Sequence, residues 1–249
     1  MGDPLRLYGL KAVVVNAADG IGEAVARTLV KHGAKVLAVD TSNSGVEQRF
    51  KSVKGVDGLV ADLTLPGKQP ELIEAAVDKL GGIDILVCDF PLQAEAPISA
   101  SGDALDQLLS RRADLTMAIC RAALPHLQKS PSGRIINVGF LRSLFTADGG
   151  PALNQSELNL ASITRALAVE IGEFGITANY VQPGAVMTPA SREVFRKNHA
   201  MRDYCIANSA ARRLGEPVDV AKVVLFLASD DAMFVNGSGI AVDGGRTDA

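Results

Sequence analysis

The chain has 249 residues, a length that fits one large α/β domain whose core needs neither disulfides nor metals. Its formal net charge of -3 excludes the strongly basic face required for binding to nucleic acid or anionic membrane. Three widely spaced cysteines, Cys88, Cys120 and Cys205, predict reduced structural thiols. With no apolar run of membrane-spanning length and no metal motif, we expect a soluble, cytoplasmic protein without a metal site.

Short apolar runs alternate with amphipathic segments along the chain. Runs that are apolar on both faces are typical of parallel strands covered by helices on both sides. Strands are therefore expected at 12–15, 36–39, 58–61, 83–88, 134–138, 177–181 and 240–242. Helices are expected at 21–32, 71–80, 103–127, 152–174 and 218–228, with Gly33 and Gly175 as C-caps of the first and fourth. This order predicts an α/β fold with one doubly wound sheet of seven parallel strands and helices on both faces.

The first strand breaks into a turn of small residues, 16–22, that opens the first helix. Such a strand, turn and helix direct backbone N–H groups and the positive helix end at one point, which suits a pyrophosphate. A turn of this type carries glycine at its first position, where this chain has Asn16, a residue that tolerates left-handed dihedrals but adds a side chain facing the cofactor. Gly20 and Gly22 have an alternative, purely structural role in packing this turn.

Further motifs follow in the same order: Asp40 at the end of the second strand, Asp62-Leu63 after the third, and the segments 121–127, 133–138, 175–179, 183–188 and 242–245. With Gly20-Ile21-Gly22 they make the chain resemble the short-chain dehydrogenase/reductase family over essentially its whole length. The resemblance implies a single Rossmann-type domain, 1–249, with 187–214 as a candidate lid. It also implies vestigial cofactor contacts at Gly20, Ile21, Gly22, Asp40, Asp62, Leu63 and Thr188. Asp40 and Asp62 are alternatively solvated strand ends.

The chemistry of this family uses a Tyr, a Lys four residues later, a Ser and a helical Asn. Counting back from Gly175 places Leu153 at the Tyr position, Glu157 at the Lys position and Phe140 at the Ser position. Counting back from Arg121 places Arg112 at the Asn position. Leucine has no proton to transfer, and a carboxylate at 157 could not stabilise a tyrosinate. The resemblance therefore implies a chain without catalytic residues of its own.

The inventory of residue types gives the same answer without an alignment. The tyrosines are Tyr8, Tyr180 and Tyr204, and none lies on the helix expected at 152–174. The cofactor side also departs from the family, whose Asn-Asn-Ala-Gly stretch after the fourth strand is here Cys88-Asp89-Phe90-Pro91. Phe90 and Pro91 are expected to fill space that an adenosine ribose needs, so we expect either no bound cofactor or weak NAD binding.

Two oppositely charged residues, Arg112 and Glu157, stand at tetrad positions that lie close together in the family. Because an unpaired buried ion is costly, we predict that they form an ion pair. The first hypothesis for function is a silent structural or regulatory subunit of a hetero-oligomeric NAD-dependent hydroxyacyl dehydrogenase, possibly one acting on hydroxyacyl-CoA. Its partner would be an active homologue in a tetramer, or a second copy of this chain, held through helices 103–127 and 152–174, with Ala161 and Ile163 as expected interface positions. The alternatives are an enzyme of altered chemistry that uses Glu157 and Arg112, and an NAD(H) sensor.

Overall fold

The computed structural model of the chain describes residues 6–41, 43–62, 65, 67–90, 102–139 and 150–246, and the side chains of 102–110 and 150–158 are not described. Its centre is one sheet of seven strands, all parallel, in the order β3-β2-β1-β4-β5-β6-β7. The strands are β1 (Lys11–Val15), β2 (Lys35–Asp40), β3 (Val56–Val60), β4 (Ile85–Cys88), β5 (Arg134–Val138), β6 (Thr177–Pro183) and β7 (Gly239–Val242). The predicted doubly wound α/β fold is confirmed.

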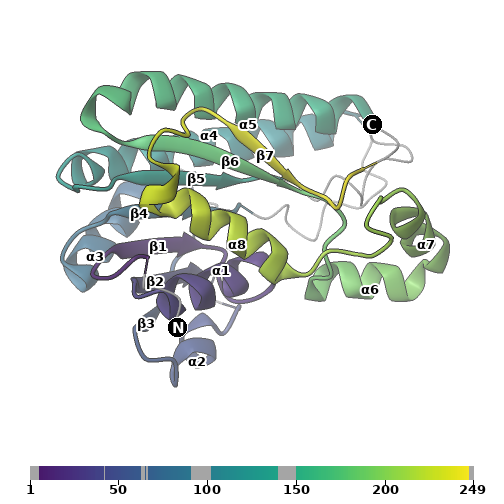
Figure 1. The fold of residues 1–249 in the computed structure, drawn as a ribbon, viewed down its shortest axis with the longest axis horizontal. Helices are drawn as coiled ribbons and strands as arrows, with labels where there is room; N and C mark the ends of the chain where they lie inside the picture. The colour runs from purple at the N-terminus through teal and green to yellow at the C-terminus, as the bar shows by residue number, and fades with distance from the viewer. Residues whose placement is uncertain are drawn as a thin grey trace.

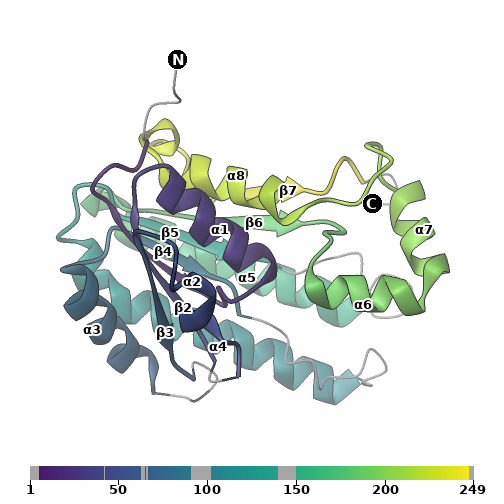
Figure 2. The same ribbon diagram turned by 90° about the horizontal axis from the view of Figure 1, so that it is seen from below.

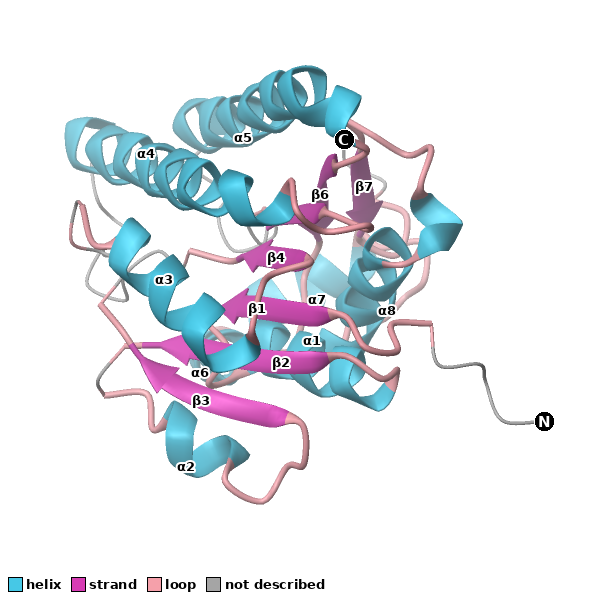
Figure 3. Cartoon of the chain, turned by 90° about the vertical axis from the view of Figure 1, so that its left-hand side faces the viewer, coloured by secondary structure: helices cyan, strands magenta, loops and turns pink. Residues whose placement is uncertain are grey.

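Helices cover both faces of this sheet. On one face lie α1 (Gly20–Lys31) and α8 (Pro217–Ala228), and on the other lie α3 (Gln69–Leu80), α4 (Gly102–Leu127) and α5 (Gly150–Ile171), as Figure 1 and Figure 3 show. The five predicted helices are all present, and their bounds differ from the expected ones by at most three residues. No helix in the described part of the chain is long and apolar enough to cross a membrane.

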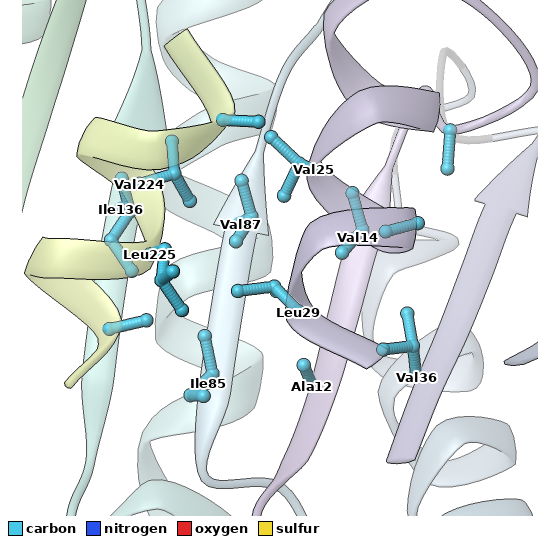
Figure 4. Packing of buried hydrophobic residues seen from close by; sticks show 14 of the residues in the cluster. Ala12, Val14, Val25, Leu29, Val36, Ile85, Val87, Ile136, Val224 and Leu225 are labelled. Carbon is cyan, nitrogen blue, oxygen red and sulfur yellow. The ribbon is translucent and has the colours of Figure 1, made fainter. Parts of the chain in front are cut away.

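Alternate residues of β1, β2, β4 and β5 enter two separate apolar layers, as buried parallel strands require. In β1, Ala12 and Val14 pack toward α1 and α8, whereas Val13 and Val15 pack toward α3 and α4. Figure 4 shows the first layer, where Val25 and Leu29 of α1 and Val224 and Leu225 of α8 meet the central strands. This double layer fixes the carboxyl ends of the strands at one edge of the sheet, which is where the predicted site lies.

The segment 187–214, predicted as a lid, contains two helices that the sequence analysis did not predict. They are α6 (Pro189–Lys197) and α7 (His199–Ala207), and both lie beyond the carboxyl end of β6 (Figure 2). A third helix that was not predicted, α2 (Val46–Phe50), packs beside β3. Closure of α6 and α7 over the site stays a prediction.

Candidate nucleotide crevice

The turn between β1 and α1 has the backbone conformation that its sequence predicts. Asn16 lies in the left-handed region with φ 58°, so asparagine does take the place of the expected glycine there. Gly22 has no room for a side chain, because a Cβ at this position would stand 1.9 Å from the carbonyl oxygen of Asn16. The structural role considered for Gly22 is therefore confirmed, and it is compatible with a ligand above the turn.

Asp40, at the carboxyl end of β2, fastens this turn to the sheet. One of its carboxylate oxygens accepts a hydrogen bond of 2.8 Å from the backbone N–H of Ala18, and the other accepts one of 2.7 Å from the N–H of Thr41. The side chain is 9% exposed, so Asp40 is not the solvated strand end considered as its alternative. It is a buried carboxylate held by backbone donors beside the turn 16–22, and the carboxyl edge of the sheet at this turn is hereafter called the crevice.

The first turn of α1 presents backbone N–H groups to this crevice. Asp19 occupies the N-cap position in an extended conformation, and its side chain makes no capping hydrogen bond. Burial, and next the neighbouring charge of Asp40, raise the pKa of Asp19 above its usual value. A helix N-terminus without a side-chain cap fits the pyrophosphate of a dinucleotide, whereas the carboxylates beside it oppose an anion.

Asp89 is a residue of this site that the sequence analysis named only as part of a motif. It follows β4, and its carboxylate accepts a hydrogen bond of 3.4 Å from the side-chain amide of Asn16. Burial raises the pKa of Asp89 to about 6, although the charge of Arg112 and the amide of Asn16 act in the opposite direction. A carboxylate directly after a central strand that pairs with β1 was the signal that could have identified it.

Arg112 of α4 reaches the same edge of the sheet from the other side. Its Nε donates a hydrogen bond of 2.8 Å to the carbonyl of Phe90, and one terminal nitrogen donates one of 2.7 Å to the carbonyl of Val138. The guanidinium is buried and joins the ends of β4 and β5. The side chain of Glu157 is not among the described ones, so the Arg112–Glu157 ion pair stays a prediction. Leu153 lies on α5 with its side chain equally undescribed, and Phe140 lies outside the described residues.

Of the other residues predicted to contact a cofactor, Thr188 lies next to the turn between β1 and α1. Thr188 caps α6, its Oγ1 accepting a hydrogen bond of 3.1 Å from the N–H of Ser191, and its methyl group lies over Gly20. Asp62 is exposed after β3, and Leu63 and Pro91 lie outside the described residues. Ile21 is buried in the layer beneath α1.

Phe90 is not exposed toward the crevice. Its ring is 4% exposed and belongs to the apolar layer under α3 and α4, together with Val15, Val39 and Leu115. The ring therefore stabilises the core at the end of β4. That it also fills adenosine space stays a prediction.

The match to known proteins covers nearly the whole chain. The family model described as enoyl-(acyl carrier protein) reductase matches residues 16–247. The 3-oxoacyl-[acyl-carrier-protein] reductase FabG of Vibrio cholerae is 30% identical over 243 residues, which cover 97% of this chain and 98% of that protein. The chain belongs to the short-chain dehydrogenase/reductase family.

Two further members of the short-chain dehydrogenase/reductase family bear on the site. The (2S)-[(R)-hydroxy(phenyl)methyl]succinyl-CoA dehydrogenase subunit BbsD of Thauera aromatica is 30% identical over 241 residues, covering 95% of this chain and 96% of that one. A solved structure from Beutenbergia cavernae, assigned as an NAD(P)-dependent gluconate 5-dehydrogenase with bound NADP, has a TM-score of 0.84 and 28% identity. The match covers 99% of this chain and 100% of that chain. The family of this chain is thus one of oxidoreductases, with members that bind a nicotinamide dinucleotide.

Proposed function

We propose that this chain is a catalytically silent member of its family that serves as a structural or regulatory subunit of an NAD-dependent hydroxyacyl dehydrogenase. The observation that carries the proposal is the role of Arg112. At the position where the family carries its helical Asn, this side chain is buried and donates to the carbonyls of Phe90 and Val138. These two donors hold strand ends together, which argues against Arg112 as the anion clamp of an enzyme with altered chemistry.

The positions of the tyrosines support the proposal. Tyr180 is buried in β6, where its ring packs over Gly239, and Tyr8 is exposed near the N-terminus. Tyr204 lies on α7 and is 47% exposed. None of the three stands on α5, where the family places its proton donor, so any tyrosine-based transfer in this chain would have to use Tyr204.

An outer surface suited to a partner is present on α4 and α5. The two helices pack side by side, and Arg121 of α4 forms an ion pair with Glu170 of α5. Next to this pair in the sequence, Val169 is 86% exposed. The expectation that Ala161 faces a partner is wrong, because Ala161 is 6% exposed within the chain and packs with Leu160 and Tyr180.

The name of one relative favours a multi-subunit complex. BbsD is by its name a subunit of a dehydrogenase that acts on a hydroxyacyl-CoA. We propose the same class of assembly for this chain, with an active homologue as the partner. We further propose that the intact turn and helix N-terminus leave a weak NAD(H) site in this subunit.

The test is co-expression with a homologue that has an intact Ser and Tyr-x-x-x-Lys, followed by size exclusion and an NAD-dependent activity assay. Purified alone, this chain should show no turnover, and the pair should elute as one complex with higher activity than the homologue alone. A chain that stays monomeric at micromolar concentration, or a homologue equally active without it, would contradict the proposal. Turnover by this chain alone that is lost in Tyr204→Phe would revive an enzyme based on α7.

A point substitution locates the interface. Val169→Asp places a charge on an exposed position of α5, so the fold of the chain should survive while a partner contact there would bury an unpaired carboxylate at a cost of several kcal/mol. Val60→Asp is the matched control, since Val60 is 39% exposed at the end of β3, the opposite edge strand of the sheet. Assembly that survives in Val169→Asp would contradict an interface at this part of α5, and assembly lost in both variants would show that the loss is not specific to α5.

A further inference from the structure

We propose that Asp89 sets the affinity of the crevice for a nicotinamide dinucleotide, which binds weakly while this carboxyl is ionised and more tightly once it is protonated. The inference rests on the weak NAD(H) site proposed above. In this inference the charge of Asp89, and not the shape of the site, controls the affinity for the dinucleotide.

The position of Asp89 follows from strand pairing. β4 lies beside β1 with Val87 opposite Val14, so Asp89 leaves the sheet beside the turn that begins at Asn16. The 3.4 Å hydrogen bond from the amide of Asn16 brings the carboxylate to this turn. A diphosphate held by the first turn of α1 would therefore lie close to the carboxylate of Asp89.

The other charged groups around Asp89 come from three neighbouring elements. Asp40 at the end of β2 and Asp19 before α1 both raise its pKa, whereas Arg112 of α4 lowers it. Asp40 itself accepts hydrogen bonds from the N–H groups of Ala18 and Thr41. The thiol of Cys88, which precedes Asp89, is buried and has a pKa raised well above its usual value, so it contributes no charge near neutral pH.

Asp89 therefore changes its charge within the pH range in which proteins are commonly studied. Burial outweighs the attraction of Arg112 and places the pKa of Asp89 at about 6. Above this pH the crevice presents a further negative charge to the two negative charges of a dinucleotide diphosphate. A bound anion should raise the pKa of Asp89 again, and each unit of that rise makes the affinity tenfold lower at high pH than at low pH.

The experiment is calorimetric titration of the purified chain with NAD+ at pH 5.2 and pH 8.0 and equal ionic strength. The variants are Asp89→Asn, which removes the charge but keeps an acceptor for Asn16, and Asp78→Asn, a matched control at an exposed position of α3. We expect about tenfold tighter binding at pH 5.2 for the unmodified chain and for Asp78→Asn. Asp89→Asn should bind at both pH values as tightly as the unmodified chain binds at pH 5.2.

Two results would overturn the inference. One is equal affinity of the unmodified chain at the two pH values, and the other is a pH dependence that Asp89→Asn retains. Absence of NAD+ binding by the unmodified chain and by Asp89→Asn at both pH values would refute the inference together with the weak site. The subunit proposal would stand, because size exclusion with the homologue tests it separately.

Discussion

Replacing Arg112 by asparagine, the residue type that the family carries there, should destabilise this chain. Asparagine is too short to reach from α4 to the strand ends, so the carbonyls of Phe90 and Val138 would lose their donors at 2.8 and 2.7 Å. A hydrogen bond to a charged group contributes about 1.5–3 kcal/mol, so two of them contribute about 3–6 kcal/mol. Relief from keeping a guanidinium buried offsets part of this loss, which leaves about 3 kcal/mol.

Urea denaturation followed by circular dichroism measures the difference in unfolding free energy. For a chain of this length, about 3 kcal/mol corresponds to a fall in Tm of about 6–12 °C. Arg111→Asn is the matched control, because Arg111 is the exposed neighbour on the same helix, and its replacement should cost less than about 1 kcal/mol. The loss of unfolding free energy in Arg112→Lys should lie between those of the two asparagine variants. A single ammonium does not reproduce the two guanidinium donors that span both carbonyls.

An Arg112→Asn variant that loses no more stability than Arg111→Asn would contradict this role of the guanidinium. That result would mean that the strand ends are satisfied without the guanidinium. It would also weaken the proposal that Arg112 has a structural role at this position.

Four further outcomes are expected. Because the pKa of Asp89 is raised from 3.8 to about 6, the folded chain binds the extra proton between about pH 4 and 6, and its stability falls as pH rises through that window. Asp89→Asn should therefore gain about 3 kcal/mol in urea denaturation at pH 8 and nothing at pH 3.5. Gly22→Ala should lower the yield of soluble protein, or cost more than about 2 kcal/mol, because its Cβ would stand 1.9 Å from a backbone oxygen. The three cysteines are all buried, so they should resist a thiol reagent until urea unfolds the chain, and burial also raises the pKa of the Cys88 thiol. Rapid labelling of the native chain would refute this. Leu153→Tyr alone should give no NAD-dependent turnover, because Glu157 would raise the pKa of the new phenol; measurable turnover would contradict the assignment of position 157.

Strands were predictable because their burial on both faces leaves uninterrupted apolar runs in the sequence. Only their ends were misplaced, and hydrogen bonds across the sheet explain why. β4 begins at Ile85 and not at 83, because Asp84 accepts hydrogen bonds from the N–H of Lys11 and from the hydroxyl of Ser130. β6 continues to Pro183, because its last residues pair with β7. In both cases the hydrogen-bond partners lie far away in the sequence, so a local pattern does not reveal them.

The two helices of the candidate lid were missed for a different reason. α6 buries only Ser191 and Phe195 among its described side chains, so its sequence lacks the apolar periodicity of a core helix. Its beginning was nevertheless readable, since Thr188 caps the helix and is followed by proline. The cap would have been the better guide here than the hydrophobic pattern.

In the candidate site, the residues of the motifs could be predicted from the sequence, whereas one contact between charged and polar side chains could not. The glycines and Asp40 could be placed from the sequence because backbone geometry fixes them. The contact between Asn16 and Asp89 could not, because it depends on the pairing of β1 with β4 and on the depth at which the carboxylate lies. Asn16 in the turn and Asp89 after β4 each differ from the residue expected at that position of the family. Together they form a hydrogen bond of 3.4 Å, so each of the two side chains has its partner in the other.

That pairing connects the two proposals for this chain. In the proposed role, a subunit without its own proton donor would gain nothing from tight cofactor binding, so a carboxylate that opposes the diphosphate would carry no cost in activity. Arg112 lies between the two functions, because it lowers the pKa of Asp89 while it holds the ends of β4 and β5 together. Removing the guanidinium should therefore also raise the pKa of Asp89 and shift the pH dependence of NAD+ binding upward. An unchanged pH dependence, or a shift in the opposite direction, would contradict the action of Arg112 on Asp89.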